Sequence, residues 1–270
     1  MMNAPLPEIG GIARTSLVTL FCRALETQRP DGMIRDEKAL QLVRALDVDF
    51  SRLKPAAEDQ ITTVMRAVRF DRYAENFLHA CPDGTVVEIG CGLDTRFSRV
   101  DNGRVHWFDV DLPEVIEIRR RFFSESTRYR FFAGSILDGE WIPAVRQQPG
   151  PCLFLAEGVL PYLEPRDVEG LVGLLSREFP GSELVFDALS PLMIIVHNPQ
   201  LAAMDVSARL RWGLSDPRKL VRWGCGVELL DAWHYFEDRN PRLGWRNLAR
   251  FIPILARSAG VYRYRLGSPS

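Results

Sequence analysis

The residues best suited to bind a ligand surround a turn that contains Gly90 and Gly92. The turn follows an apolar run at 85–89, and a second apolar run ends at Asp111. Glycine has no Cβ, so the backbone of such a turn can lie close to a ligand. An acidic residue about 20 positions later is well placed to accept hydrogen bonds from both hydroxyls of a ribose. The spacing therefore predicts a bound cofactor that contains a nucleoside.

The residues next to the turn narrow the choice of cofactor. A dinucleotide site needs a third glycine, G-x-G-x-x-G, but Thr95 stands at that position. Glu88 precedes the glycines, and its carboxylate would repel a pyrophosphate but suit a cationic group. S-adenosylmethionine has a sulfonium, an amino-acid end and a ribose, so we expect this cofactor and its product S-adenosylhomocysteine. An NAD(P)-dependent oxidoreductase is an alternative that these residues disfavour. A second alternative is a tight turn that binds no ligand.

A second acidic position follows another apolar run, at 152–156. Glu157 and Gly158 come directly after it. A carboxylate at the mouth of a parallel sheet is costly unless it is partnered or faces a ligand. Glu157 is therefore a candidate site residue, although it could instead cap the next segment.

Alternating strands and helices position these residues. Strands are expected near 85–89, 105–109, 129–132, 152–156 and 183–187, with helices near 94–100, 113–124, 140–147 and 165–179. This alternation predicts an α/β fold with a mainly parallel sheet. Apolar periodicity predicts three earlier helices, from residue 15 or 16 to 28, over 36–46 and over 58–79. Later elements are expected as helices at 199–214, 219–223 and 248–257 and a strand at 260–266.

We divide the chain into four parts: an N-terminal helical cap (1–80), a Rossmann-like core (81–190), a helical insertion on the acceptor side (191–247) and a C-terminal helix and strand (248–270). Lys and Arg number 34 against 35 Asp and Glu, so no basic excess indicates a nucleic-acid partner. Five cysteines without a C-x-x-C pair predict free thiols and no metal site. No signal peptide or long apolar window is visible, so we expect a cytoplasmic protein without membrane spans.

Three motifs resemble the leucine carboxyl methyltransferase family, including its bacterial polyketide O-methyltransferase branch. They are V-V-E-I-G-C-G-L-D-T-R-F-S-R-V at 86–100, F-D-V-D-L-P at 108–113 and A-E-G-V-L-P-Y at 156–162. The similarity extends over most of residues 12–190. The resemblance implies a class I S-adenosylmethionine-dependent methyltransferase fold, with a mostly parallel seven-stranded sheet that has an antiparallel edge strand.

The resemblance also implies roles for individual residues. Gly90 would lie under the methionine part of the cofactor, and Asp111 would bind the ribose. Glu157 would lie near the amino-acid end or the reacting centre, and Arg66 would bind the cofactor carboxylate. Arg14 would supply a further basic group. The full set of expected cofactor-binding residues is Arg66, Glu88, Gly90, Gly92, Asp111, Leu112, Ser135, Ile136, Leu137, Glu157 and Gly158.

Adenine recognition departs from the family pattern. Ile136 stands where many members have an acidic residue that bonds the adenine amino group. We therefore expect Ser135, the backbone at Ile136 and Leu137, or Asp138 to hold adenine instead.

The acceptor pocket is expected to be built from the N-terminal helices and the segment 190–247. The acceptor is expected to be a carboxylate or a phenolic hydroxyl of a small, polyketide-type molecule. A carboxylate is ionised at neutral pH and needs no general base, whereas a phenol with a pKa of about 10 would benefit from one. Glu157, Tyr162 and His197 are the catalytic candidates. A protein C-terminal carboxyl methyltransferase is the alternative. The oligomeric state is left open, with a homodimer as one option.

Overall fold

The computed structural model describes residues 11–53, 55–203 and 208–267. Its strands form one seven-stranded sheet in the order β3-β2-β1-β4-β5-β7-β6. The strands are β1 (Thr85–Ile89), β2 (His106–Asp111), β3 (Tyr129–Ala133), β4 (Cys152–Ala156), β5 (Glu183–Leu189), β6 (Glu228–His234) and β7 (Ala259–Arg265). The α-helices are α1 (Gly11–Thr27), α2 (Glu37–Ala45), α3 (Ala57–Ala80), α4 (Arg96–Val100), α5 (Pro113–Phe122), α6 (Ile142–Arg146), α7 (Pro165–Glu178), α8 (Pro191–Ala203) and α9 (Pro253–Ala256). The 3₁₀ segments are η1 (Phe50–Arg52), η2 (Leu160–Tyr162), η3 (Pro217–Trp223) and η4 (Pro241–Phe251).

The direction of the strands creates a binding edge. β1 pairs in parallel with β2 on one side and β4 on the other, so the strand order reverses at β1. β7 runs antiparallel to β5 and β6, which puts the antiparallel pairing at one edge of the sheet. In open sheets of this type, ligands bind outside the carboxyl ends of the strands where the order reverses.

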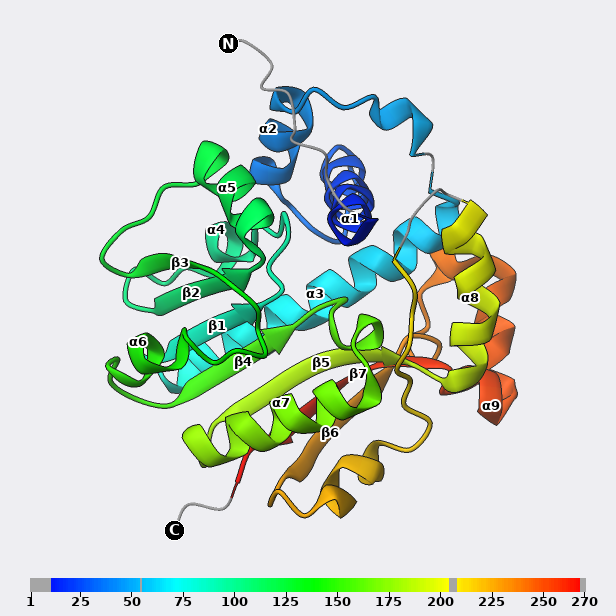
Figure 1. Cartoon of the computed structure of the whole chain (residues 1–270). Coiled ribbons are helices and arrows are strands. Elements are labelled where there is room, and N and C mark those ends of the chain that lie inside the picture. Colours follow the sequence, from blue (N-terminus) through cyan, green and yellow to red (C-terminus); the bar gives the residue numbers. More distant parts are fainter. Residues whose placement is uncertain (1–10, 54, 204–207, 268–270) are drawn as a thin grey trace.

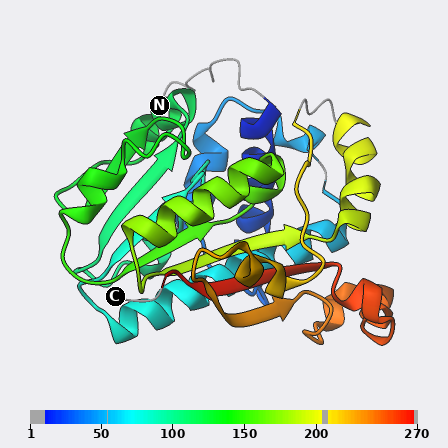
Figure 2. The same ribbon diagram turned by 60° about the horizontal axis from the view of Figure 1, so that its bottom comes forward.

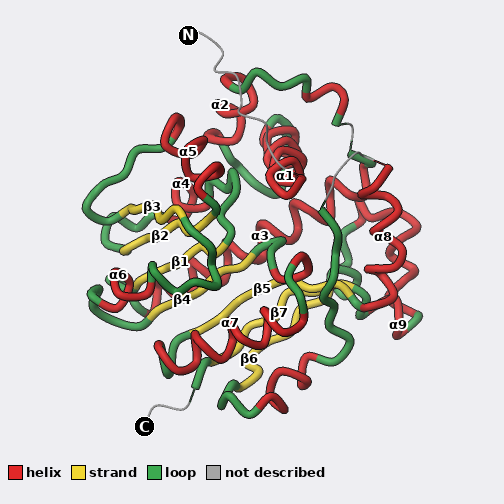
Figure 3. Tube along the Cα trace, viewed as in Figure 1, coloured by secondary structure: helices red, strands yellow, loops and turns green. Residues whose placement is uncertain are grey.

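Helices cover both faces of the sheet, as Figures 1 and 3 show. Successive strand residues point to opposite faces. Val86 packs with buried residues of α3 and α5 on one face, while Val87 packs with buried residues of α6 and α7 on the other. The central strands are therefore buried on both sides, which explains their continuous apolar runs.

Helices α1 and α2 lie at the carboxyl end of the central strands, above the sheet in Figure 1 and behind α7 in Figure 2. Leu20 of α1 and Leu42 of α2 are fully buried in the same core as Phe70 of α3. The N-terminal helices are thus packed onto the sheet domain. Within the described residues, none of the helices has both the length and the apolar character needed to cross a membrane.

The five core strands and the terminal strand lie where the sequence predicts them. The helix expected over 199–214 is wrong, because α8 begins eight residues earlier, at Pro191, and contains Pro199 in its interior. Proline is favoured at the first position of a helix, and Pro191 occupies that position here. The late helix expected over 248–257 is divided between η4 and α9.

Strand β6 was not predicted. It lies within the segment interpreted as a helical insertion, and most of its residues are half-buried at the sheet edge. Its sequence, E-L-L-D-A-W-H, has no clear two-residue alternation, so its pairing with β7 is what makes it a strand.

Candidate active site

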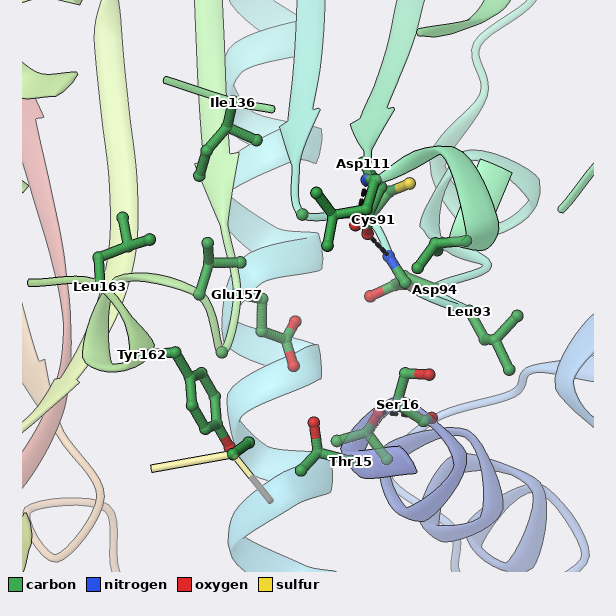
Figure 4. A pocket seen from close by; sticks show the side chains of 18 of the residues that line it. Thr15, Ser16, Cys91, Leu93, Asp94, Asp111, Ile136, Glu157, Tyr162 and Leu163 are labelled. Atoms are coloured by element: carbon green, nitrogen blue, oxygen red, sulfur yellow. Dashed lines mark hydrogen bonds between the residues drawn. The ribbon is translucent and has the colours of Figure 1, made fainter. Parts of the chain in front are cut away.

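A cavity of about 490 Å³ opens at the carboxyl ends of the central strands. The glycine turn, the end of β2, the segment after β3 and the segment after β4 form one side of it. Helix α1 and the segment at 208–211 complete the wall. Figure 4 shows Thr15 and Ser16 of α1 facing Glu157 and Tyr162 across this space.

The two glycines of the turn are needed for conformation and for space. Gly90 and Gly92 have φ angles of +66° and +48°, which L side chains rarely adopt. A Cβ on Gly90 would lie 2.4 Å from Cγ2 of Val159, and one on Gly92 would lie 3.1 Å from Cβ of Ser16. The turn therefore passes close to both walls of the cavity. It forms a cradle that any larger residue would fill.

Asp111 lies at one end of the cavity with both carboxylate oxygens oriented by the backbone. Oδ2 accepts from the N–H of Gly92 at 2.7 Å, and Oδ1 accepts from the N–H of Leu112 at 2.7 Å (Figure 4). An ionised carboxylate has about four acceptor positions, so each oxygen can still accept from a ribose hydroxyl. Burial raises the pKa of Asp111, and the two backbone N–H groups partly oppose that rise.

The expected adenine segment also lines the cavity. Ser135, Ile136 and Leu137 are all present in its wall, and Ser135 Oγ accepts from the N–H of Leu137 at 3.1 Å. Asp138 lies outside this cavity, in a shallow surface hollow beside α6 and α7. The wall near Ile136 thus offers apolar surface and backbone groups to a flat ring, with no carboxylate from Asp138.

Arg66 and Glu157 meet at the centre of the site. Arg66 Nε donates to Oε1 of Glu157 at 2.9 Å, and Nη1 donates to Oδ2 of Asp187 at 2.9 Å. Burial disfavours the charged form of Arg66, but Asp187 and Glu157 outweigh it and raise its pKa well above the ordinary value. Asp187 was not predicted as a site residue. The available signal was an acidic residue inside the apolar run at 184–189.

Glu88 was predicted to contact the cofactor, but it does not line the cavity. The side chain is buried, and its carboxylate accepts from Nη1 of Arg96. Burial and the nearby Asp94 raise the pKa of Glu88 well above its ordinary value. The acidic residue in β1 therefore serves an internal ion pair and does not face a cationic ligand.

Arg96 links several carboxylates beneath the cavity. Its Nη2 donates to Oε2 of Glu157, and its Nε donates to Oδ1 of Asp71 at 2.8 Å. The side chain is fully buried. Arg96 thus holds the oxygen of Glu157 that Arg66 does not bind, and the orientation of Glu157 is determined from both sides.

The N-terminal helices were expected to help form the acceptor pocket, and α1 does line the cavity, although the residues concerned were not predicted. Thr15, Ser16 and Thr19 line the cavity, and the Tyr162 hydroxyl is hydrogen-bonded to Thr15. The available signal was the placement of three hydroxyl residues within five positions of an amphipathic helix. The side chain of Arg14, which the family resemblance implicated, lies outside the described residues.

Two of the three catalytic candidates line the cavity, and the third does not. Glu157 and Tyr162 line the cavity, and burial raises the pKa of Tyr162. His197 lies on α8 with Nδ1 2.8 Å from the carbonyl oxygen of Met193, and it is absent from the described cavity wall. Among the described wall residues there is no histidine. Among all the residues that the structure describes, no group of three or more His, Cys, Asp or Glu side chains could hold a metal ion.

The sheet order and the site at its reversal point define a class I methyltransferase fold. The solved structure of a protein from Thermobifida fusca, named as a candidate methyltransferase, matches this fold with a TM-score of 0.60 and 18% identity. The match covers 95% of this chain and 94% of that one. The solved structure of a DUF574 family protein from Streptomyces avermitilis also matches with a TM-score of 0.60. Its sequence is 14% identical, and the match covers 94% of this chain and 97% of that one.

Sequence comparison identifies the family. The model for leucine carboxyl methyltransferase matches residues 16–175. The chain is 33% identical over 261 residues to the tetracenomycin polyketide synthesis O-methyltransferase TcmP of Streptomyces glaucescens, covering 94% of this chain and 96% of that protein. It is 30% identical over 272 residues to the S-adenosyl-L-methionine-dependent methyltransferase dpfgK of Gibberella zeae, covering 90% and 88%. The chain belongs to the leucine carboxyl methyltransferase family.

Proposed function

We propose that the chain is an S-adenosylmethionine-dependent O-methyltransferase that acts on a small, polyketide-like acceptor. The observation that carries the proposal is the cavity in which Asp111 lies at one end and the Arg66–Glu157 pair at the centre. Its family membership and its 33% identity to a polyketide O-methyltransferase agree with this assignment. A protein-carboxyl acceptor and an NAD(P)-dependent reaction are not favoured.

The residues of the cavity suit the parts of this cofactor. Asp111 would accept hydrogen bonds from the ribose hydroxyls, and the wall at Ser135, Ile136 and Leu137 would hold adenine. The amino-acid end of the cofactor has an ammonium and a carboxylate group, so it needs a hydrogen-bond acceptor and a cation nearby. Arg66 and Glu157 supply these groups, and Gly90 leaves room for the chain between them.

When bound, S-adenosylmethionine supplies an electrophilic methyl group on a sulfonium. The role of the protein is then to align the acceptor oxygen and to exclude water, which can account for most of the rate of such a displacement. Helix α1 covers the cavity and is linked through Thr15 to Tyr162, so these elements would exclude water from the reacting atoms.

We propose a carboxylate as the acceptor group over a phenol. A phenol needs a base to remove its proton, but the described wall contains no histidine and the carboxylate of Glu157 is bound by Arg66 and Arg96. Tyr162 has a raised pKa and stays protonated at neutral pH. A carboxylate acceptor is already ionised and requires none of these groups as a base.

A cytoplasmic location and a small-molecule acceptor are part of the same proposal. All five cysteines lie in the described part of the chain and are free thiols. Free thiols of this kind are typical of a reducing compartment.

Calorimetric titration tests the cofactor. S-adenosylhomocysteine should bind to the purified chain, while NAD and NADP should give no measurable heat of binding. Absence of S-adenosylhomocysteine binding would overturn the proposal. Incubation with labelled S-adenosylmethionine and matched panels of aromatic carboxylic acids and phenols then tests the acceptor. Mild base should release methanol from the product, as from a methyl ester, whereas a base-stable product would identify a phenol ether.

A further inference from the structure

Helix α8 has an exposed apolar face. Its 13 residues include no Asp, Glu, Lys or Arg. Leu192, Ile195 and Val196 are all exposed, Ile195 by 70%. A helix that faces water normally has charged residues on its outer side. The composition of α8 is therefore that of a helix covered by another surface.

A second group of exposed apolar side chains lies on η4 and α9. Trp245, Leu248, Phe251, Ile252 and Ile254 are each exposed by half or more, and Trp245 is exposed by 73%. Single exposed apolar residues are common on soluble proteins, but five within ten positions form a patch.

The two groups lie at the same end of the molecule. The N–H of Ser190, directly before α8, donates to the carbonyl of Ser258, two residues after the end of α9, at 2.7 Å. Figures 1 and 2 both show α8 and α9 at the end of the sheet marked by the last residues of β5 and the start of β7. We call these eight side chains, on α8 and on η4–α9, the apolar end.

The apolar end is large enough to form an interface. With about 150–250 Å² for each aromatic side chain when fully exposed and less for each aliphatic one, its eight members together expose on the order of 700 Å². The largest apolar patch on a typical monomer is about 300–600 Å². A standard interface buries about 800 Å² on each partner.

We propose that the apolar end is the interface of a homodimer. In a twofold dimer the same surface packs against itself, so it must be complementary to itself. An uncharged α8 meets this condition without like-charge repulsion. Two of the cations beside this surface already have contacts within the chain, because Arg246 lies 3.2 Å from Asp59 and Arg250 lies over the ring of Phe251. An acidic partner would find no cation on α8 to bind.

Analytical ultracentrifugation of the full chain at micromolar concentration, without cofactor or acceptor, tests the interface independently of the proposed reaction. The wild type should sediment with twice the mass of one chain. The variant Ile195→Asp/Ile254→Asp should sediment as a single chain, with an association at least about 100-fold weaker, because the twofold axis brings four carboxylates into the apolar contact. Val221→Asp, on η3, is the matched control, since Val221 is an exposed apolar residue outside the apolar end. It should behave as the wild type.

Far-ultraviolet circular dichroism and titration with S-adenosylhomocysteine establish that each variant is folded. A wild-type chain that stays a monomer at tens of micromolar would overturn the proposal, and so would a folded double variant that remains a dimer. If the monomeric wild type sediments with vesicles that contain phosphatidylserine, the apolar end belongs to a lipid surface and the homodimer is wrong.

Discussion

At the scale of single residues, the site combines positions that are close in sequence with positions that are far apart. Asp111 is oriented by the backbone of Gly92 and Leu112, at the two ends of the segment that contains α4 and β2. Arg66 and Glu157 are 91 positions apart and meet only in the folded chain. The position of Asp111 at the cavity was therefore predictable from spacing alone, whereas Arg66 was predicted only from the family resemblance.

Replacing Asp111 with Asn should weaken S-adenosylhomocysteine binding. The substitution removes one acceptor oxygen and the charge, and hydrogen bonds to charged groups are worth about 1.5–3 kcal/mol. Calorimetry should therefore show a dissociation constant roughly 10- to 100-fold higher. The raised pKa of Asp111 adds a pH test. Wild-type affinity should decline as the pH falls through that raised pKa and Asp111 is protonated, and this decline should be reduced in the variant.

Asp138→Asn is the matched control for the Asp111 variant, because Asp138 is exposed and lies outside the cavity. Its affinity should equal that of the wild type. An equal loss in both variants would contradict the placement of the ribose at Asp111, and a loss in Asp138→Asn alone would restore Asp138 as an adenine ligand.

At the scale of elements, a buried ion-pair network joins α1 and α2 to α4. Asp36 caps α2 through the N–H of Ala39 at 2.9 Å, and its other oxygen accepts from Arg23 Nε at 3.0 Å and Arg99 Nη1 at 2.7 Å. Burial would raise the pKa of Asp36, but Arg99 and Arg23 outweigh it and hold the pKa below its ordinary value. The network therefore holds the N-terminal helices over the cavity.

Asp36→Asn should destabilise the fold while it keeps the helix cap. Asn retains an acceptor for Ala39 but leaves Arg23 and Arg99 without the carboxylate charge, which in a buried network costs about 3–5 kcal/mol. Urea denaturation at neutral pH measures this loss. A carboxyl group with a lowered folded-state pKa stabilises above its unfolded pKa of about 3.9 and loses that effect as pH falls through the folded value. The difference between wild type and variant should therefore shrink at acidic pH.

The exposed pair Arg104–Asp83 provides the comparison for the buried network. Both side chains are more than half exposed, so solvent screens their interaction. Asp83→Asn should leave the urea midpoint nearly unchanged. A similar midpoint for Asp36→Asn and the wild type would show that the network does not hold α2 in place.

At the scale of the whole molecule, one sheet separates two apolar cores, and the cavity opens at its edge under α1. Leu155 of β4 packs into the core shared with α1 and α3, while Phe154 packs into the core shared with α6 and α7. A ligand in the cavity would contact α1, the ends of β1 and β2 and the segment after β4 together. Binding should therefore stabilise the chain as a unit.

S-adenosylhomocysteine should raise the thermal midpoint. At 100 times its dissociation constant, a ligand that binds only the folded state stabilises it by about 2.7 kcal/mol. For a chain of this size, that corresponds to about 5–10 °C. Differential scanning calorimetry at fixed protein concentration measures the shift, because any dimerisation also depends on concentration. Asp111→Asn at the same ligand concentration should show a smaller shift, and an unshifted wild-type midpoint at that concentration would contradict cofactor binding to the native fold.

The core strands, the glycine turn and the place of Asp111 could be predicted from the sequence, because side-chain periodicity and turn chemistry act over a few neighbouring residues. The sequence also indicated the family through three short motifs. The fold was needed to show that Glu88 pairs with Arg96, which residues of α1 line the cavity, that His197 lies outside the described cavity wall and that β6 completes the sheet. Each of these depends on how the segments pack in three dimensions, and such packing leaves no pattern in the local sequence.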